Sequence, residues 1–145
     1  MKTKKTVFTF ALSAILLNCV QAQHLDLQGH RGGMGLMPEN TIAAMLNGIK
    51  VGVRTLELDV VISKDGKVVV SHDGFMSSEF MLKPDGSGIS KDEEKNLSLY
   101  HMPYDSIQRF DAGNKPHPRF AHQQKMKTYK PLLTDLIDSA GNYVK

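Results

Sequence analysis

The sequence predicts an α/β fold, and three features of its first half carry that prediction. Apolar and polar residues alternate over Leu25–Gln28, as in a short strand. Apolar residues then recur with the period of a helix over Pro38–Val51, and they alternate again over Thr55–Ile62. A strand, a helix and a second strand in this order form one βαβ-type unit, with neighbouring strands and the helix packed on one face.

The first predicted strand leads directly into Gly29-His30-Arg31. Three glycines follow at positions 32, 33 and 35, and glycine permits a tight loop that approaches a ligand closely. Taken alone, the glycines would indicate only a plain turn. The histidine and arginine beside them favour a ligand-binding loop.

The predicted helix over Pro38–Val51 has recognisable signals at both ends. Pro38 marks its beginning, Asn40 or Thr41 can cap it, and Gly52 is suited to the position after its last turn. Its buried face should consist of Ile42, Met45, Leu46 and Ile49.

In the second predicted strand, Leu56, Leu58, Val60 and Ile62 should point one way, opposite to Glu57 and Asp59. Lys64-Asp65-Gly66-Lys67 then predicts a two-residue hairpin turn into a strand over Val68–Ser71. Pairing Lys64 with Lys67 would place Asp59 directly opposite His72. The turn is either an excursion beyond a parallel strand or a sign that two segments run antiparallel, and the sequence leaves both open.

The second half of the sequence is less regular. Residues 75–100 read as an insertion or loop that could border a substrate cleft. Pro103–Arg109 predicts a short helix that buries Ile107 and Phe110. A last helix should begin near Lys130 with Pro131 in its first turn and end at Gly141. The remaining histidines are interpreted as ordinary surface or loop residues: His101, His117 and His122.

The first 22 residues are interpreted as a secretory signal peptide, with a membrane anchor as the alternative. Lysines precede an apolar run over Val7–Leu17 that is too short to span a bilayer, and cleavage is expected after Ala22. The only cysteine, Cys19, lies in this leader, so no disulfide is expected in the mature domain 23–145. We expect a secreted or periplasmic protein without a stable membrane anchor.

Charge does not favour a nucleic-acid partner. The formal net charge is +3, but the three lysines of the leader account for it. The remaining chain carries 15 basic and 15 acidic residues by the same count. A balanced chain provides no electrostatic attraction for nucleic acid or for an anionic membrane.

Five chemically active side chains stand close together in the sequence: His30, Arg31, Glu57, Asp59 and His72. Carboxylates suit a hard divalent cation, an arginine fork suits phosphate oxygens, and histidines transfer protons near neutral pH. This combination indicates metal-assisted chemistry on a phosphate ester.

The order and spacing of these residues resemble the glycerophosphodiester phosphodiesterase family. Further similarity extends from Tyr100-His101-Met102 through Phe110–Gly113 to Lys130–Leu133. The strongest matching motifs are His30-Arg31-Gly32, Pro38-Glu39-Asn40-Thr41, Glu57-x-Asp59, Asp65-Gly66 and His72-Asp73.

The resemblance implies a TIM-type (β/α) barrel that hydrolyses glycerophosphodiesters to glycerol 3-phosphate and an alcohol. It implies that His30 and His72 form the catalytic acid/base pair and that Arg31 binds the substrate phosphate. It assigns Glu57 and Asp59 to a divalent metal, Ca²⁺ or Mg²⁺. The residues expected to support these groups are Glu39, Asn40 and Asp73.

Length suggests that only the first half of such a barrel is present. Residues 23–145 are too few for a barrel of roughly 250 residues. The resemblance places the third metal carboxylate beyond Lys145, and we expect an unpaired sheet edge and exposed apolar residues. The alternatives are a non-catalytic fragment, a phosphate-binding module, or a related phospholipase that acts on lipid headgroups.

Overall fold

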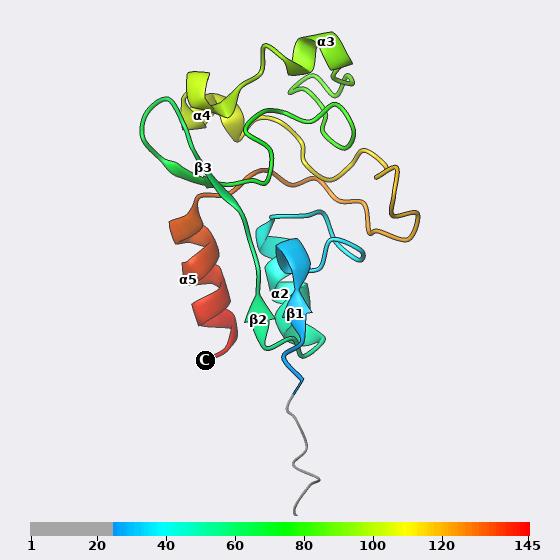
Figure 1. Cartoon of the computed structure of the whole chain (residues 1–145), viewed down its shortest axis with the longest axis vertical. Helices are drawn as coiled ribbons and strands as arrows, with labels where there is room; N and C mark the ends of the chain where they lie inside the picture. The colour runs from blue at the N-terminus through cyan, green and yellow to red at the C-terminus, as the bar shows by residue number, and fades with distance from the viewer. Residues whose placement is uncertain (1–24) are drawn as a thin grey trace, which may run out of the picture.

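The computed structural model describes residues 25–145, whose arrangement is shown in Figure 1. The expected leader, with Cys19, lies outside the described residues. No helix in the described part is long and apolar enough to cross a bilayer. The elements in chain order are β1 (Gln28–Gly29), η1 (His30–Gly32), α2 (Ile42–Lys50), β2 (Thr55–Leu56), β3 (Val60–Ile62), β4 (Val68–Val70), α3 (Lys91–Glu94), η2 (Leu99–His101), α4 (Tyr104–Ile107) and α5 (Leu133–Tyr143).

The first three regular segments form the predicted βαβ unit. β1 and β2 pair in parallel, with Gln28 opposite Thr55, and α2 connects them (Figure 1). β1 is shorter than the predicted strand and begins later. Leu25 and Leu27 are 78% and 57% exposed, so their alternation does not reflect a buried face.

Helix α2 begins at Ile42, later than predicted, because Thr41 is its cap. The Thr41 hydroxyl accepts a hydrogen bond from the Ala44 N–H at 3.1 Å. At the other end, the N–H groups of Gly52 and Val53 bond to the last helical carbonyls. This pattern confirms that Gly52 follows the helix. Of the predicted buried face, Met45 is fully buried, whereas Ile42, Leu46 and Ile49 are half-buried, and Ala44 and Gly48 are the other buried residues of the helix.

The predicted strand over Thr55–Ile62 is interrupted at residues 57–59. There the backbone leaves the parallel pair: the Glu57 N–H still donates to the Gly29 carbonyl of β1, but the Glu57 carbonyl accepts the Gly32 N–H of the loop at 3.1 Å. The chain then continues into an antiparallel pair of β3 and β4. Both arrangements left open by the sequence are therefore present, a parallel pair followed by an antiparallel hairpin.

The hairpin turn contains three residues, so the predicted register is wrong by one position. Ser63, not Lys64, closes the turn with Lys67: its N–H donates to the Lys67 carbonyl at 3.0 Å. The Ser63 hydroxyl accepts the Lys67 N–H, and Gly66 adopts a φ of +74°. This is the three-residue turn that ends in a left-handed glycine. Asp59 consequently lies opposite Ser71 rather than His72, and the Ser71 N–H donates to the Asp59 carbonyl.

Two hydrophobic clusters meet at β4. The larger cluster contains Val69 and the apolar residues of the insertion and of α4, including Ile107 and Phe110 as predicted. The smaller cluster contains Met45, Val70 and Leu136. Successive residues of one strand thus belong to different clusters, because strand side chains alternate between faces.

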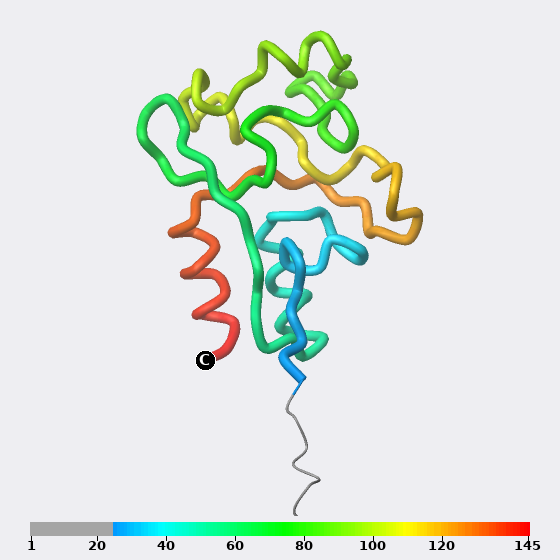
Figure 2. Tube along the Cα trace, in the orientation of Figure 1, coloured from blue at the N-terminus to red at the C-terminus, as the bar shows by residue number. Residues whose placement is uncertain are grey.

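The segment that precedes α5 is extended, and Pro131 does not begin the helix as predicted. The Val70 N–H donates to the Pro131 carbonyl at 2.8 Å, and Leu132 forms a bridge with Val69. Pairing with β4 holds this segment out of the helix. Figure 2 shows it crossing the molecule between the α2 side and the α3–α4 side. The helix also continues past Gly141 to Tyr143.

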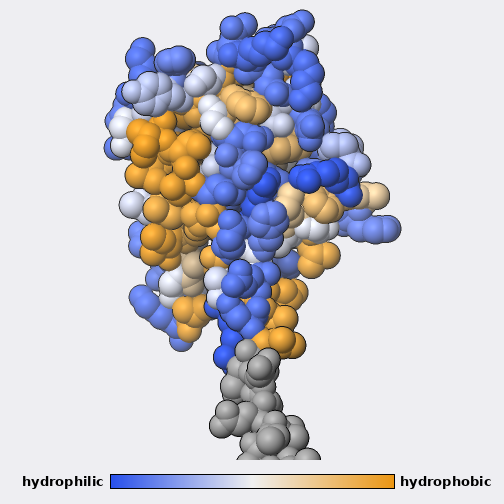
Figure 3. All heavy atoms as spheres, viewed as in Figure 1, coloured by the Kyte–Doolittle hydropathy of each residue, from blue (hydrophilic) through white to orange (hydrophobic). Residues whose placement is uncertain are grey.

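An apolar surface extends over β3, β4 and α5, and it is visible as the orange area in Figure 3. Val60 and Ile62, predicted to lie opposite to Glu57 and Asp59 on the strand, are 47% and 46% exposed, and Ile137 is 58% exposed. The break at residues 57–59 changes which side chains face the core, so that Val61 packs inward instead. A groove of roughly 510 Å³ separates α5 from α2 and β2. The predicted exposure of apolar residues is confirmed.

Candidate active site

The site is built on the loop after β1, which carries His30 and Arg31. Arg31 has a φ of +51°, a left-handed conformation that is rare for residues other than glycine. The next residue, Gly32, packs against α2: an added Cβ would lie 2.9 Å from the Ala44 backbone. Gly48 of the helix provides the matching space, because its own Cβ would lie 2.8 Å from the Gly32 oxygen. Two glycines in contact therefore hold the loop against α2.

Glu57 fixes this loop from the end of β2. Its Oε2 accepts the Arg31 N–H at 2.7 Å and lies 3.9 Å from His30 Nε2. The Glu57 side chain is 37% exposed, whereas that of His30 is 63% exposed. The left-handed conformation at Arg31 is thus stabilised by the carboxylate that the sequence assigned to a metal.

Asp59 and the supporting residues surround the arginine side chain. Arg31 Nη1 donates to Glu39 Oε1 at 2.8 Å, and Arg31 Nε lies 3.6 Å from Asp59 Oδ2. The Asn40 side chain bonds to Asp59 twice: its amide donates to Oδ2 and its oxygen accepts the Asp59 N–H. The structure thus places Glu39 against the Arg31 side chain and Asn40 against Asp59.

His72 follows β4 and is oriented by its neighbour. Its Nδ1 lies 2.8 Å from Asp73 Oδ1, and because a carboxylate only accepts, Nδ1–H is the donor of this bond. The preceding residue, Ser71, is fully buried, and its hydroxyl donates to the Asp73 carbonyl at 2.6 Å. Behind it, Lys130 Nζ donates to the Ser71 hydroxyl at 2.6 Å.

A cleft of roughly 400 Å³ brings His72 and Arg31 together. The insertion forms its other wall with Phe75 and Glu79, as expected for a loop that borders a substrate cleft, and Arg119 completes it. Cationic, anionic and aromatic side chains thus line one open pocket. Such a lining suits a polar ligand that carries a phosphate group.

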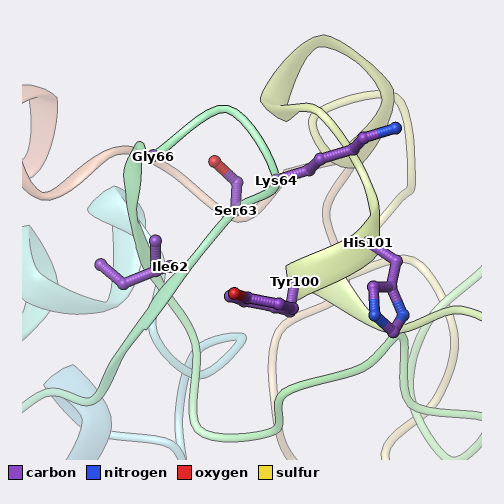
Figure 4. A pocket seen from close by; sticks show the side chains of 6 residues that line it. All are labelled: Ile62, Ser63, Lys64, Gly66, Tyr100 and His101. Carbon is purple, nitrogen blue, oxygen red and sulfur yellow. The ribbon is translucent and has the colours of Figure 1, made fainter.

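A separate hollow of roughly 420 Å³ lies between the hairpin turn and η2. Figure 4 shows Tyr100 directed toward Ile62 and Ser63, whereas the side chains of Lys64 and His101 extend away from them. His101 is exposed, as predicted. The side chains that line this hollow therefore bring no acidic and basic pair together.

The two metal-ligand candidates lie in one network but do not form a complete site. Among residues 25–145, no group of three histidine, cysteine or acidic side chains is placed to hold a metal ion. Oε2 of Glu57 and Oδ2 of Asp59 are used by protein donors. One oxygen of each carboxylate remains for a cation. Two carboxylates supply fewer oxygens than Ca²⁺ or Mg²⁺ requires, so the remaining ligands would have to come from water or from a bound phosphate.

Two buried cationic or titratable residues were missed by the sequence analysis. His117, expected to be an ordinary surface or loop residue, lies outside helices and strands but is only 6% exposed, and it stacks on Phe80 with ring centroids 5.5 Å apart. Burial lowers its pKa. Lys130 is 4% exposed, and burial lowers its pKa to about 8. The sequence did contain a signal for the burial of Lys130, because three apolar residues follow it: Pro131, Leu132 and Leu133.

Comparison with known proteins gives a consistent result. Residues 30–144 match the glycerophosphoryl diester phosphodiesterase family. A putative glycerophosphodiester phosphodiesterase of Bacillus subtilis, YhdW, is 36% identical over 119 residues, which are 78% of this chain and 44% of that protein. Human lysophospholipase D GDPD1 is 57% identical over 44 residues, 30% of this chain and 14% of that protein. The chain spans less than half the length of these relatives.

Solved structures support the same relationship. A putative glycerophosphoryl diester phosphodiesterase from Silicibacter pomeroyi superposes with a TM-score of 0.77 at 29% identity, covering 85% of this chain and 42% of that one. A phosphodiesterase from Oleispira antarctica, solved with the product sn-glycerol-3-phosphate, gives 0.60 at 27% identity and covers 82% and 41%. The parallel β1–β2 pair and α2 therefore belong to an α/β fold of the TIM type.

Proposed function

Because the chain belongs to the glycerophosphoryl diester phosphodiesterase family, we propose that the protein hydrolyses glycerophosphodiesters to glycerol 3-phosphate and an alcohol. The observation that carries this proposal is the network around Arg31. Its backbone bonds to Glu57, its side chain bonds to Glu39 and approaches Asp59, and it shares a cleft with His72. Residues 25–145 would form the first part of the barrel.

The phosphate group would bind at Arg31. A guanidinium with an exposed edge in the cleft donates to phosphate oxygens in a fork. Glu39 and Asp59 restrict the arginine side chain from behind, so little conformational entropy is lost on binding. A divalent cation, Ca²⁺ or Mg²⁺, would be held by the free oxygens of Glu57 and Asp59. When bound, it would neutralise part of the phosphate charge.

Proton transfer would be carried out by the two histidines. One would accept the proton of the substrate hydroxyl that attacks phosphorus, and the other would protonate the alkoxide that leaves. Water would then open the cyclic phosphate so formed to give glycerol 3-phosphate. His72 suits the first role, because Asp73 holds its Nδ1–H and stabilises the imidazolium that forms. His30 is exposed beside Glu57 and suits the second role.

The test is release of glycerol 3-phosphate from glycerophosphocholine. His30→Ala or His72→Ala should each lower the rate by about 10² to 10⁴, the usual contribution of a positioned acid or base. Asp59→Ala should lose activity that high Ca²⁺ or Mg²⁺ partly restores, and calorimetry should show weaker cation binding. His101→Ala, an exposed residue outside the cleft, is the matched control. Undiminished turnover in both histidine variants would refute this assignment.

A second candidate is lysophospholipase D activity, favoured by the similarity to the human enzyme of that name. Both reactions cleave a phosphodiester, and they differ in whether the substrate retains an acyl chain. Turnover of lysophosphatidylcholine above that of glycerophosphocholine would favour the lipid substrate. If neither is cleaved while phosphate still binds, the non-catalytic phosphate-binding alternative would hold. We also propose a secreted or periplasmic location, which fractionation of the source cells would test.

A further inference from the structure

Three buried polar atoms without a hydrogen bond lie in one chain of side chains. Among residues 25–145, the buried side-chain nitrogens and oxygens that lack a partner are Arg31 Nε, Glu39 Oε2 and His117 Nε2. Buried polar groups are nearly always paired, because an unpaired one loses its interactions with water. The three unpaired atoms belong to neighbouring residues, since Arg31 and His117 each approach Glu39. Their clustering requires an explanation.

The contacts run from the cleft into the interior. Arg31 donates to Glu39 through Oε1 at 2.8 Å. The second oxygen of Glu39 faces His117 Nε2 at 3.9 Å, about 1 Å longer than a hydrogen bond. The side chains of His117 and Glu39 are 1% and 3% exposed. Glu39 thus joins an arginine in the cleft to a histidine in the interior.

The orientation of His117 is determined on both sides of its ring. Phe80 stacks on it, and Phe120 lies 4.7 Å away between centroids. Its Nδ1 accepts the Arg119 N–H at 3.1 Å. In a neutral imidazole the other nitrogen then carries the hydrogen. Nε2–H therefore points at Glu39, and burial, which lowers the pKa of His117, favours this neutral form.

We propose that His117 is a positioning residue that orients Glu39, and through Glu39 the guanidinium of Arg31, for phosphate binding. This inference rests on the proposed function only for the identity of the ligand. A small rotation of Glu39 would complete the bond from Nε2–H and pair both buried atoms. Phosphate at Arg31 would favour that rotation, because the guanidinium and the carboxylate move together.

The decisive variant is His117→Phe. It keeps a ring between Phe80 and Phe120 but removes the Nε2–H donor, and so separates packing from hydrogen bonding. We expect the dissociation constant of inorganic phosphate to rise about tenfold, the range for one hydrogen bond to a charged group. The KM for glycerophosphocholine should rise by a similar factor, while kcat changes less than about threefold. His117→Gln, which retains an N–H donor, should recover most of the loss.

The control is Phe120→Leu, which disturbs the same packing and leaves the donor in place. It should lower the urea midpoint without changing phosphate affinity. His117→Phe removes an unpaired buried donor and also the acceptor of the Arg119 N–H; because Arg119 is exposed, that N–H can bond to water instead, and the midpoint should change little. Inorganic phosphate is titrated into each protein, and the NMR resonance of Arg31 Nε–H reports binding. No diester is present, so turnover does not contribute.

The outcomes separate the two proposals. Weaker phosphate binding in His117→Phe supports the positioning role even if no diester is hydrolysed, in which case only the proposed function fails. Wild-type affinity and KM in His117→Phe would overturn the positioning role while the enzyme stays active. Absence of phosphate binding by the wild-type protein would overturn both.

Discussion

Lys130 is a buried cation whose removal should stabilise the protein at neutral pH. The residue is 4% exposed, its ammonium group bonds to the Ser71 hydroxyl, and burial lowers its pKa from 10.5 to about 8. The unfolded chain therefore binds the Lys130 proton more tightly than the folded protein does. Consequently the wild-type protein should gain stability as pH rises from about 8 to about 10.5.

The size of the effect follows from the two pKa values. One pH unit corresponds to about 1.4 kcal/mol, so the charged lysine costs about 3 kcal/mol below pH 8. Lys130→Met removes this cost and also the bond to Ser71, worth about 1 kcal/mol. The variant should therefore be more stable than the wild type by about 2 kcal/mol at pH 7. Above pH 10.5 that advantage should disappear.

The assay is urea denaturation of both proteins at several values between pH 7 and 11. The difference between wild type and variant isolates Lys130, because other groups titrate equally in both. Among them is Tyr104, whose pKa burial raises to about 12, with the opposite effect on stability at high pH. Lys127→Met, at an exposed lysine of the same segment, should show no pH-dependent difference. A difference between wild type and Lys130→Met that is constant with pH would refute the reasoning.

Two further predictions concern helix α2. Thr41→Ala should lower the free energy of unfolding by about 1–2 kcal/mol, because it removes the hydroxyl that caps the Ala44 N–H. Thr41→Ser keeps a hydroxyl and should retain most of the wild-type stability, as measured by the urea midpoint. Gly48→Ala should destabilise the protein even though alanine favours helices by about 1 kcal/mol. Its Cβ would lie 2.8 Å from the Gly32 oxygen, and overpacking of this kind costs about 1–3 kcal/mol. Urea denaturation at neutral pH shows whether helix propensity or overpacking dominates. A Gly48→Ala protein more stable than the wild type would contradict the close contact between Gly48 and Gly32.

The βαβ unit could be predicted from sequence because its signals are local. The apolar period of α2, its threonine cap and Gly52 all act within a few residues of the feature that they determine. The hairpin register could not be predicted in the same way. It depends on the Ser63 hydroxyl, which bonds to the Lys67 N–H and closes the turn one residue earlier than the glycine signal indicates.

The residues of the candidate site also differ in whether local sequence signals reveal them. Arg31 and Glu57 could be identified because their motifs are short and carry distinct chemistry, and the structure places them in contact. His117 could not be identified, because its burial depends on Phe80, 37 residues earlier in the chain. A histidine between two prolines indicates an extended segment, and it does not reveal which side chains will cover it.

Because the interior consists of two hydrophobic clusters that meet at β4, parts of the protein can unfold locally without the rest. The loop that carries Arg31 packs through Gly32 on α2 at Met45, a member of the smaller cluster, whereas His117 stacks on Phe80 in the larger one. Amide protons in the two clusters can therefore exchange with solvent at different rates, as separate cooperative units. A ligand that bridges the cleft would bind only when both units are closed, and it would slow exchange in both together.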